Sequence, residues 1–189
     1  MGNTASSNIR AAGLDNLVGE LGSECQYEKS MGDSRFLKTL KARHTCGPLV
    51  VKTFFKPNRD AEQGSFSLAE LVRRLREERE SLADAPNVLA YQTVIETDNA
   101  GYLVRQWLAS SLYDRISTRP FLTSIEKKWL SFQLLQGMRN ARLRNVPHGD
   151  LKSENILVTS SLVLYITDFA GSIKPTYLPL DDPDDFGVF

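Results

Sequence analysis

One stretch of the chain decides its fold and chemistry: His148-Gly149-Asp150-Leu151-Lys152-Ser153-Glu154-Asn155-Ile156-Leu157-Val158, followed after an apolar run by Thr167-Asp168-Phe169-Ala170. Phosphoryl transfer needs a carboxylate that orients the incoming hydroxyl, a cation near the transferred phosphoryl group and oxygen ligands for magnesium. Asp150, Lys152, Asn155 and Asp168 supply that set. The two segments therefore predict a phosphoryl-transfer site.

The sequence before this stretch predicts a β-rich region that gives way to helices. A hairpin is expected over 27–43, a strand over 49–55, and a helix that starts at Ser67 and stops before Pro86. Further strands are expected over 88–96 and 102–107. The capping-box pair Thr123 and Glu126 opens a helix that continues through Arg142.

Composition excludes several classes of protein. The 189 residues carry 23 basic and 23 acidic side chains, so the chain lacks the basic surplus of a nucleic-acid binder. Its two cysteines, Cys25 and Cys46, have no His or Cys at metal-ligand spacing, which argues against a disulfide scaffold or a zinc site. No apolar run reaches the roughly 18 residues of a membrane span. A reducing, intracellular compartment is expected.

The motifs resemble those of the eukaryotic protein-kinase family, whose catalytic loop reads H-R-D-x-K-x-x-N and whose magnesium loop reads D-F-G. The run 49–52, Leu-Val-Val-Lys, stands where kinases have V-A-I-K, and the preceding hairpin stands where they keep a glycine-rich loop. Each motif alone carries little, since a lone Lys52 is more often a solubility residue at a strand edge. Their conjunction in one order carries the assignment.

The resemblance implies an α+β fold with the two lobes of a protein kinase. A small β-rich lobe is expected over 25–106, and the first part of a helical large lobe over 107–189, truncated after the magnesium loop. Residues 1–24 are expected to be an N-terminal arm and linker. ATP and Mg²⁺ are the cofactors that this fold implies.

The resemblance also assigns roles at the reacting end of the nucleotide. It implies that Asp150 is the catalytic base or orients the hydroxyl, and that Lys152 stabilises the transferred phosphate. Asn155 and Asp168 would hold magnesium.

Other positions would bind the rest of the nucleotide. By the same resemblance, Gly32 belongs to the phosphate loop and Lys52 neutralises the α- and β-phosphates. The backbone of Gln106 and Leu108 would meet the base, and Leu157 would form the pocket floor. The carboxylate that holds Lys52 is assigned to Glu78, on the inward stripe of the first helix, with Glu77 as the alternative.

A narrower resemblance covers nearly the whole chain. The strings 111–121, Ser-Leu-Tyr-Asp-Arg-Ile-Ser-Thr-Arg-Pro-Phe, and 174–179, Lys-Pro-Thr-Tyr-Leu-Pro, look like one branch of the family. That branch is the kinase-like regulatory subunit of the class III phosphatidylinositol 3-kinase complex, which acts in vacuolar sorting and autophagy. The catalytic subunit of that complex and its associated sorting and autophagy subunits are the implied partners.

The first residues, Met1-Gly2-Asn3-Thr4-Ala5-Ser6, fit the N-myristoylation pattern, with Gly2 as the acylated residue. One myristoyl chain binds membranes only weakly, so partners are expected to add a second attachment. The expected location is the cytoplasmic face of endosome, Golgi or vacuole membranes.

Departures from active kinases leave two alternatives to an enzyme. Ser34 and Leu37 replace phosphate-loop glycines, Gly149 replaces the catalytic-loop arginine, and Ala170 replaces the glycine of D-F-G. These changes favour a nucleotide-binding scaffold that regulates the lipid kinase by contact. The short segment after Asp168 favours an inactive fragment instead.

Overall fold

The computed structural model describes residues 18–33, 37–55, 68–97 and 100–169. They form two compact units: one from residues up to 68 with 93–107, and the other from 69–92 with the chain from 108 onward. Within the described residues, no helix is both long enough and apolar enough to cross a bilayer.

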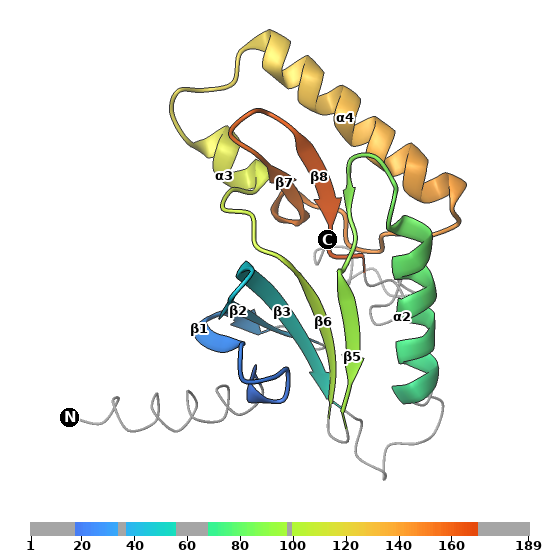
Figure 1. Cartoon of the computed structure of the whole chain (residues 1–189). Coiled ribbons are helices and arrows are strands. Elements are labelled where there is room, and N and C mark those ends of the chain that lie inside the picture. The colour runs from blue at the N-terminus through green and yellow to red at the C-terminus, as the bar shows by residue number, and fades with distance from the viewer. Residues whose placement is uncertain (1–17, 34–36, 56–67, 98–99, 170–189) are drawn as a thin grey trace, which may run out of the picture. The chain divides into compact units, whose positions relative to one another are not determined.

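The first unit is an antiparallel sheet of five strands, in the order β1-β2-β3-β6-β5 (Figure 1). The strands are β1 (Gln26–Asp33), β2 (Lys38–His44), β3 (Gly47–Phe55), β5 (Thr93–Glu96) and β6 (Ala100–Gln106). The expected hairpin and the strand after it are β1, β2 and β3. Alternating apolar residues such as Leu40, Ala42 and Val51 are fully buried and form the core of one face.

Residues just before β1, which the sequence analysis assigned to the linker, belong to this core. Val18 is 1% exposed, and Leu21 packs against the same cluster. The phenol of the buried Tyr102 donates to Glu20 Oε2 at 2.7 Å, and Thr97 Oγ1 donates to the same oxygen at 2.7 Å. The pKa of Tyr102 is raised, mainly because the phenol is buried and secondly because it is bonded to the Glu20 carboxylate.

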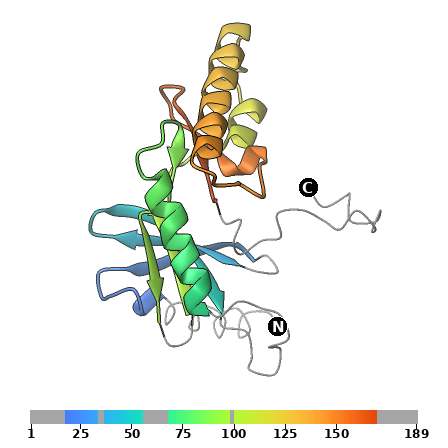
Figure 2. The same cartoon turned by 90° about the vertical axis from the view of Figure 1, so that its right-hand side faces the viewer.

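The second unit holds the longer helices, drawn in green and in yellow to orange in Figure 2, and a small sheet in the order β4-β8-β7. Its elements are α2 (Leu68–Leu82), β4 (Val88–Leu89), α3 (Leu112–Ser117), α4 (Ser124–Leu143), β7 (Ile156–Val158) and β8 (Leu164–Thr167). Ser67, the expected start of α2, lies outside the described residues. A core that includes Leu82, Leu130 and Ile166 joins α2, α4 and β8.

Both capping boxes of this unit are formed. Thr123 caps α4: its hydroxyl accepts from Glu126 N, and the Glu126 carboxylate accepts from Thr123 N at 2.7 Å. Ser111 and Asp114 do the same for α3. Each carboxylate accepts hydrogen bonds first from backbone N–H and then from the hydroxyl, so the pKa of Glu126 and that of Asp114 are lowered.

The expectation of one continuous strand over 88–96 is wrong. The run divides into β4, which pairs in parallel with β8 in the second unit, and β5, which pairs with β6 in the first. Residues 90–92 between them belong to neither sheet. The prediction of strand structure was correct for both halves, but the composition does not show which strand each half pairs with. The partner of β4 lies more than 70 positions further along the chain.

Candidate active site

The catalytic loop is folded around His148. The His148 Nδ1 atom accepts a hydrogen bond from Asp150 N at 3.2 Å, so Nε2 carries the proton and donates to Thr167 O at 2.8 Å. Gly149 has a φ of 77°, a left-handed conformation that glycine adopts without strain. The imidazole therefore ties the segment that carries Asp150 to the strand that precedes Asp168.

Three of the predicted residues meet in this loop. The amide of Asn155 donates to Asp150 Oδ2 at 3.0 Å and to the Asp150 backbone carbonyl at 2.8 Å. Lys152 Nζ lies 3.2 Å from the same Oδ2. Two donors on one oxygen fix the rotation of the Asp150 carboxylate, as a residue that positions a hydroxyl requires.

Asp168 is held in an uncommon backbone conformation at the end of β8. Its φ is 67°, and only 5% of the residue is exposed. A non-glycine residue in this region costs of order 1–3 kcal/mol and persists only where its surroundings enforce it. The neighbours supply this constraint: Thr167 Oγ1 donates to Leu89 O at 3.2 Å, and the buried Phe169 ring lies 4.5 Å from the His148 ring.

The predicted magnesium ligands have suitable chemistry. Asn155 is buried and its amide nitrogen is used by Asp150, which leaves the amide oxygen as its metal-binding atom. Asn155 and Asp168 thus offer an amide oxygen and a carboxylate, hard donors of the kind that Mg²⁺ prefers. Among the described residues no group of three or more His, Cys, Asp or Glu could hold a metal.

The residues of the sheet that are predicted to bind nucleotide lie on β3 and β6. Lys52 is 8% exposed and pairs with Leu103 in the ladder between these strands. Gln106 is the last residue of β6 and is exposed; its carbonyl accepts from the buried Arg105 at 3.2 Å. Sequence reasoning gave no role to Arg105, and the structure buries it on the strand that leads to Gln106.

Two further predicted residues lie in the second unit. Leu157 is 5% exposed in the centre of β7 and bridges to Ser111. Leu108 lies half-buried just after the end of β6 and lines a groove with Val158 and Leu162. Leu157 has the buried position expected of a pocket floor.

Of the carboxylates of α2, the structure favours Glu78 as the inward one. Glu78 is half-buried and lines a small cavity with Leu75 and Phe169, whereas Glu77 is exposed and forms an ion pair with Arg73. Glu70 lies near the start of the helix, where hydrogen bonds from Arg73 and then Arg74 lower its pKa to about 2.

The phosphate loop retains one of the glycines expected of a kinase. Gly32 is exposed at an irregularity of β1 and has a φ of 149°. Leu37, at the third glycine position, is 3% exposed and therefore belongs to the core. Gly2, Ser34 and Ala170 lie outside the described residues.

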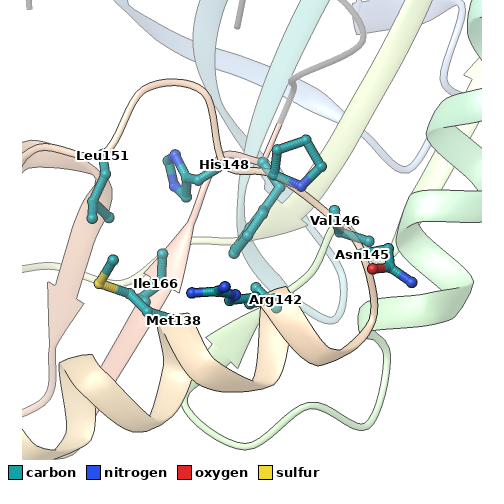
Figure 3. A pocket seen from close by; sticks show the side chains of 10 residues that line it. Met138, Arg142, Asn145, Val146, His148, Leu151 and Ile166 are labelled. Carbon is teal, nitrogen blue, oxygen red and sulfur yellow. The ribbon is translucent and has the colours of Figure 1, made fainter.

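A pocket of about 380 Å³ lies beneath the catalytic loop. Figure 3 shows His148 and Leu151 on one side of it, and Met138 and Arg142 from α4 with Ile166 from β8 on the other. Its lining is mainly apolar, and sequence reasoning did not anticipate it. The nearest signal in the sequence was the run of apolar residues around most of α4, several of which are exposed. Two of these exposed residues, Trp129 and Phe132, stack on each other.

Comparisons with known proteins agree with this arrangement. The sequence profile of the protein kinase domain matches residues 25–176. The crystal structure of Rad53 1–466 in complex with AMP-PNP superposes with a TM-score of 0.63 at 20% identity, over 77% of this chain and 38% of that one. The described residues therefore have the protein kinase fold, and the chain belongs to the protein kinase domain family.

Within that family the chain is similar to proteins called serine/threonine-protein kinase VPS15. It is 42% identical to the Arabidopsis thaliana protein over an alignment of 193 positions, which covers all of this chain and 12% of the relative. It is 45% identical to the Saccharomyces cerevisiae protein over 163 residues, which is 86% of this chain and 11% of the relative. The chain thus spans about a tenth of the length of these relatives.

Proposed function

We propose that the chain carries the phosphoryl-transfer machinery of a serine/threonine protein kinase of the VPS15 type. The observation that carries the proposal is the carboxylate of Asp150, fixed by Asn155 at 3.0 Å and Lys152 at 3.2 Å. The overall similarity to relatives called serine/threonine-protein kinase VPS15 supports it. In this proposal the hydroxyl of a protein serine or threonine is the acceptor of the phosphoryl group.

The residues divide the chemistry between binding and proton transfer. Asp150 orients the substrate hydroxyl and takes its proton, while Lys152 balances negative charge on the transferred group. Asn155 and Asp168 would hold Mg²⁺, which when bound would neutralise charge on the phosphate oxygens. Lys52, buried on β3, supplies a cation for the remaining phosphates of ATP.

The test is transfer of phosphate by the full-length protein with Asp150→Asn. Asparagine keeps the size and the polar contacts of the side chain but cannot take a proton. We expect transfer to fall by a factor of about 10² to 10⁴, the usual contribution of a general base, with nucleotide binding retained. Asp84→Asn is the matched control, because Asp84 is exposed and pairs only with Arg144 among the contacts described. Equal transfer by wild type and Asp150→Asn would refute the enzymatic function.

A nucleotide-binding scaffold is the second candidate, and one observation favours it. Leu37 is buried at the position where kinases place a flexible glycine, and its side chain removes the backbone freedom that a glycine would have there. A scaffold would bind Mg²⁺ and ATP, shown by a thermal shift that Lys52→Met removes. Wild type and Asp150→Asn would then both fail to transfer phosphate.

We also propose that the protein acts as the regulatory subunit of a class III phosphatidylinositol 3-kinase complex in sorting and autophagy. The names of the VPS15 relatives and the Gly2 pattern support this placement on endosome, Golgi or vacuole membranes. Intact mass of protein from a eukaryotic host should show a myristoyl group on Gly2 that Gly2→Ala abolishes. Co-purification of the lipid-kinase catalytic subunit with the tagged full-length protein tests the partnership, and its absence would contradict it.

A further inference from the structure

A hydrogen-bonded pair, the buried Gln133 and the half-buried Asn87, links the α2–β4 turn, helix α4 and strand β8. Gln133 is 4% exposed and lies on the inward stripe of α4, which is otherwise made of Leu130, Gly137 and Ala141. A polar residue on such a stripe needs partners, because an unsatisfied buried amide costs about 1–3 kcal/mol. Its partners are backbone groups of β8 and the preceding turn, together with the side chain of Asn87.

The side-chain amide of Gln133 forms hydrogen bonds with backbone groups at the start of β8, in the way that the backbone of a neighbouring strand would. Its Oε1 accepts from Leu164 N at 3.0 Å, and its Nε2 donates to Leu162 O at 2.8 Å. Because one side chain makes both bonds, they fix the backbone between Leu162 and Leu164, where β8 begins. Figure 1 shows α4 running past β8, which lets the amide reach this edge.

Asn87 continues the same set of bonds. Its Nδ2 donates to Leu164 O at 2.9 Å and to Gln133 Oε1 at 3.2 Å, while its backbone carbonyl accepts from Ile166 N at 2.9 Å. Asn87 has a φ of 59°, a conformation that asparagine tolerates better than most residues. Gln133 and Asn87 thus provide hydrogen-bond partners for backbone groups between Leu162 and Ile166. The short strand β4 pairs with the end of β8 that follows.

We propose that Gln133 and Asn87 are positioning residues for Asp168. Asp168 follows β8 directly and holds a φ of 67° that its surroundings must enforce. The two amides fix the register of β8 immediately before it. Because Asn87 immediately precedes β4, the same pair joins the turn between α2 and β4 to the strand that leads to Asp168.

The first test needs no nucleotide: hydrogen exchange of backbone amides in full-length protein, comparing wild type with Gln133→Met. Methionine keeps the volume of glutamine and removes its hydrogen bonds. We expect exchange at Leu164 and Asp168 to speed up about ten-fold or more, with the amides of β7 unchanged. Asn87→Gly keeps the positive φ and the backbone carbonyl, so it serves as the milder variant if Gln133→Met does not fold.

Asn140→Ala is the matched control. Asn140 Nδ2 donates from the same helix to Pro86 O at 3.1 Å, in the same loop, but the structure gives it no bond to β8. It should leave exchange at Asp168 at the wild-type rate. Unchanged exchange in Gln133→Met and Asn87→Gly, or an equal increase in Asn140→Ala, would overturn the inference.

The second test rests on the proposed function: the Mg²⁺ concentration that half-saturates ATP binding. In Gln133→Met and Asn87→Gly it should rise about five-fold, while ATP binding in EDTA stays constant. A merely structural role would lower stability without this selective shift. Altered exchange with an unchanged Mg²⁺ midpoint would also overturn the positioning role. If wild type shows no Mg²⁺-dependent binding, the proposed function fails, and exchange at Asp168 still decides the inference.

Discussion

Substituting Gly137 by alanine in α4 sets two effects of opposite sign against each other. Helix propensity alone predicts that Gly137→Ala stabilises the protein by about 1 kcal/mol, because glycine is the poorest ordinary helix former. The structure predicts the reverse. A Cβ at this position would lie 2.7 Å from the Asn87 carbonyl oxygen and 2.9 Å from Ile166 Cδ1.

The carbonyl oxygen cannot move away without cost. It accepts the hydrogen bond from Ile166 N at 2.9 Å, which joins the α2–β4 turn to β8. Overpacking costs typically 1–3 kcal/mol, and a strained or lost buried hydrogen bond adds about 1 kcal/mol. A total cost of about 3 kcal/mol against a gain of about 1 kcal/mol leaves a net destabilisation of about 2 kcal/mol.

For the transition that unfolds the kinase domain, taken as a unit of about 150–250 residues, we expect the melting temperature to fall by roughly 4–8 °C, at about 2–4 °C per kcal/mol. Differential scanning calorimetry or chemical denaturation of the full-length protein measures it. Ser131→Ala, on an exposed turn of the same helix, is the control and should change stability by only a few tenths of a kcal/mol. Ile166→Val should relieve only part of the loss, because the carbonyl contact remains. A melting temperature for Gly137→Ala equal to or above wild type would refute this reasoning.

Three further predictions concern single hydrogen-bonding groups. Tyr102→Phe removes the 2.7 Å bond to Glu20 and should cost about 1 kcal/mol in chemical denaturation; no loss would show that the bond is neutral. Thr123→Ala removes the cap of α4 and should cost about 1 kcal/mol, with Ser131→Ala again as the control. Because the fold lowers the pKa of Glu126, its stabilisation is complete above the ordinary value of 4.5 and is lost as pH falls through the lowered pKa. The stability difference between wild type and Glu126→Ala should therefore shrink below about pH 4.5, and a difference that grows on acidification would contradict this sign.

Local sequence signals predicted most elements because their causes are local. The capping box of Thr123 and Glu126 fixed the start of α4 to the residue, since both partners lie within one turn. Alternating apolar residues predicted β2 and β3, but the turn between them lies at Thr45 and Cys46, and Gly47 already pairs with His44 as the first residue of β3. The short helix α3 was not predicted as a helix, although its own capping box at Ser111 is readable in the sequence.

Long-range pairing was beyond sequence reasoning. The run 88–96 looked like one strand because its composition is uniform, yet β4 pairs with β8 and β5 with β6. Gln133 and Asn87 were missed for the same reason. The stripe of Leu130, Gly137 and Ala141 could have placed Gln133 inside the core, but not its bonds to β8.

The sequence by itself determined the inventory of chemistry: which carboxylates, amides and cations the catalytic segments contain, and in what order. Asp150, Lys152 and Asn155 lie within five positions of one another, so a single loop suffices to bring them together. Only the tertiary structure decided how Asp168 is held. Its backbone conformation depends on contacts from β4, His148 and α4, which the chain separates by up to about 80 positions and which packing alone unites.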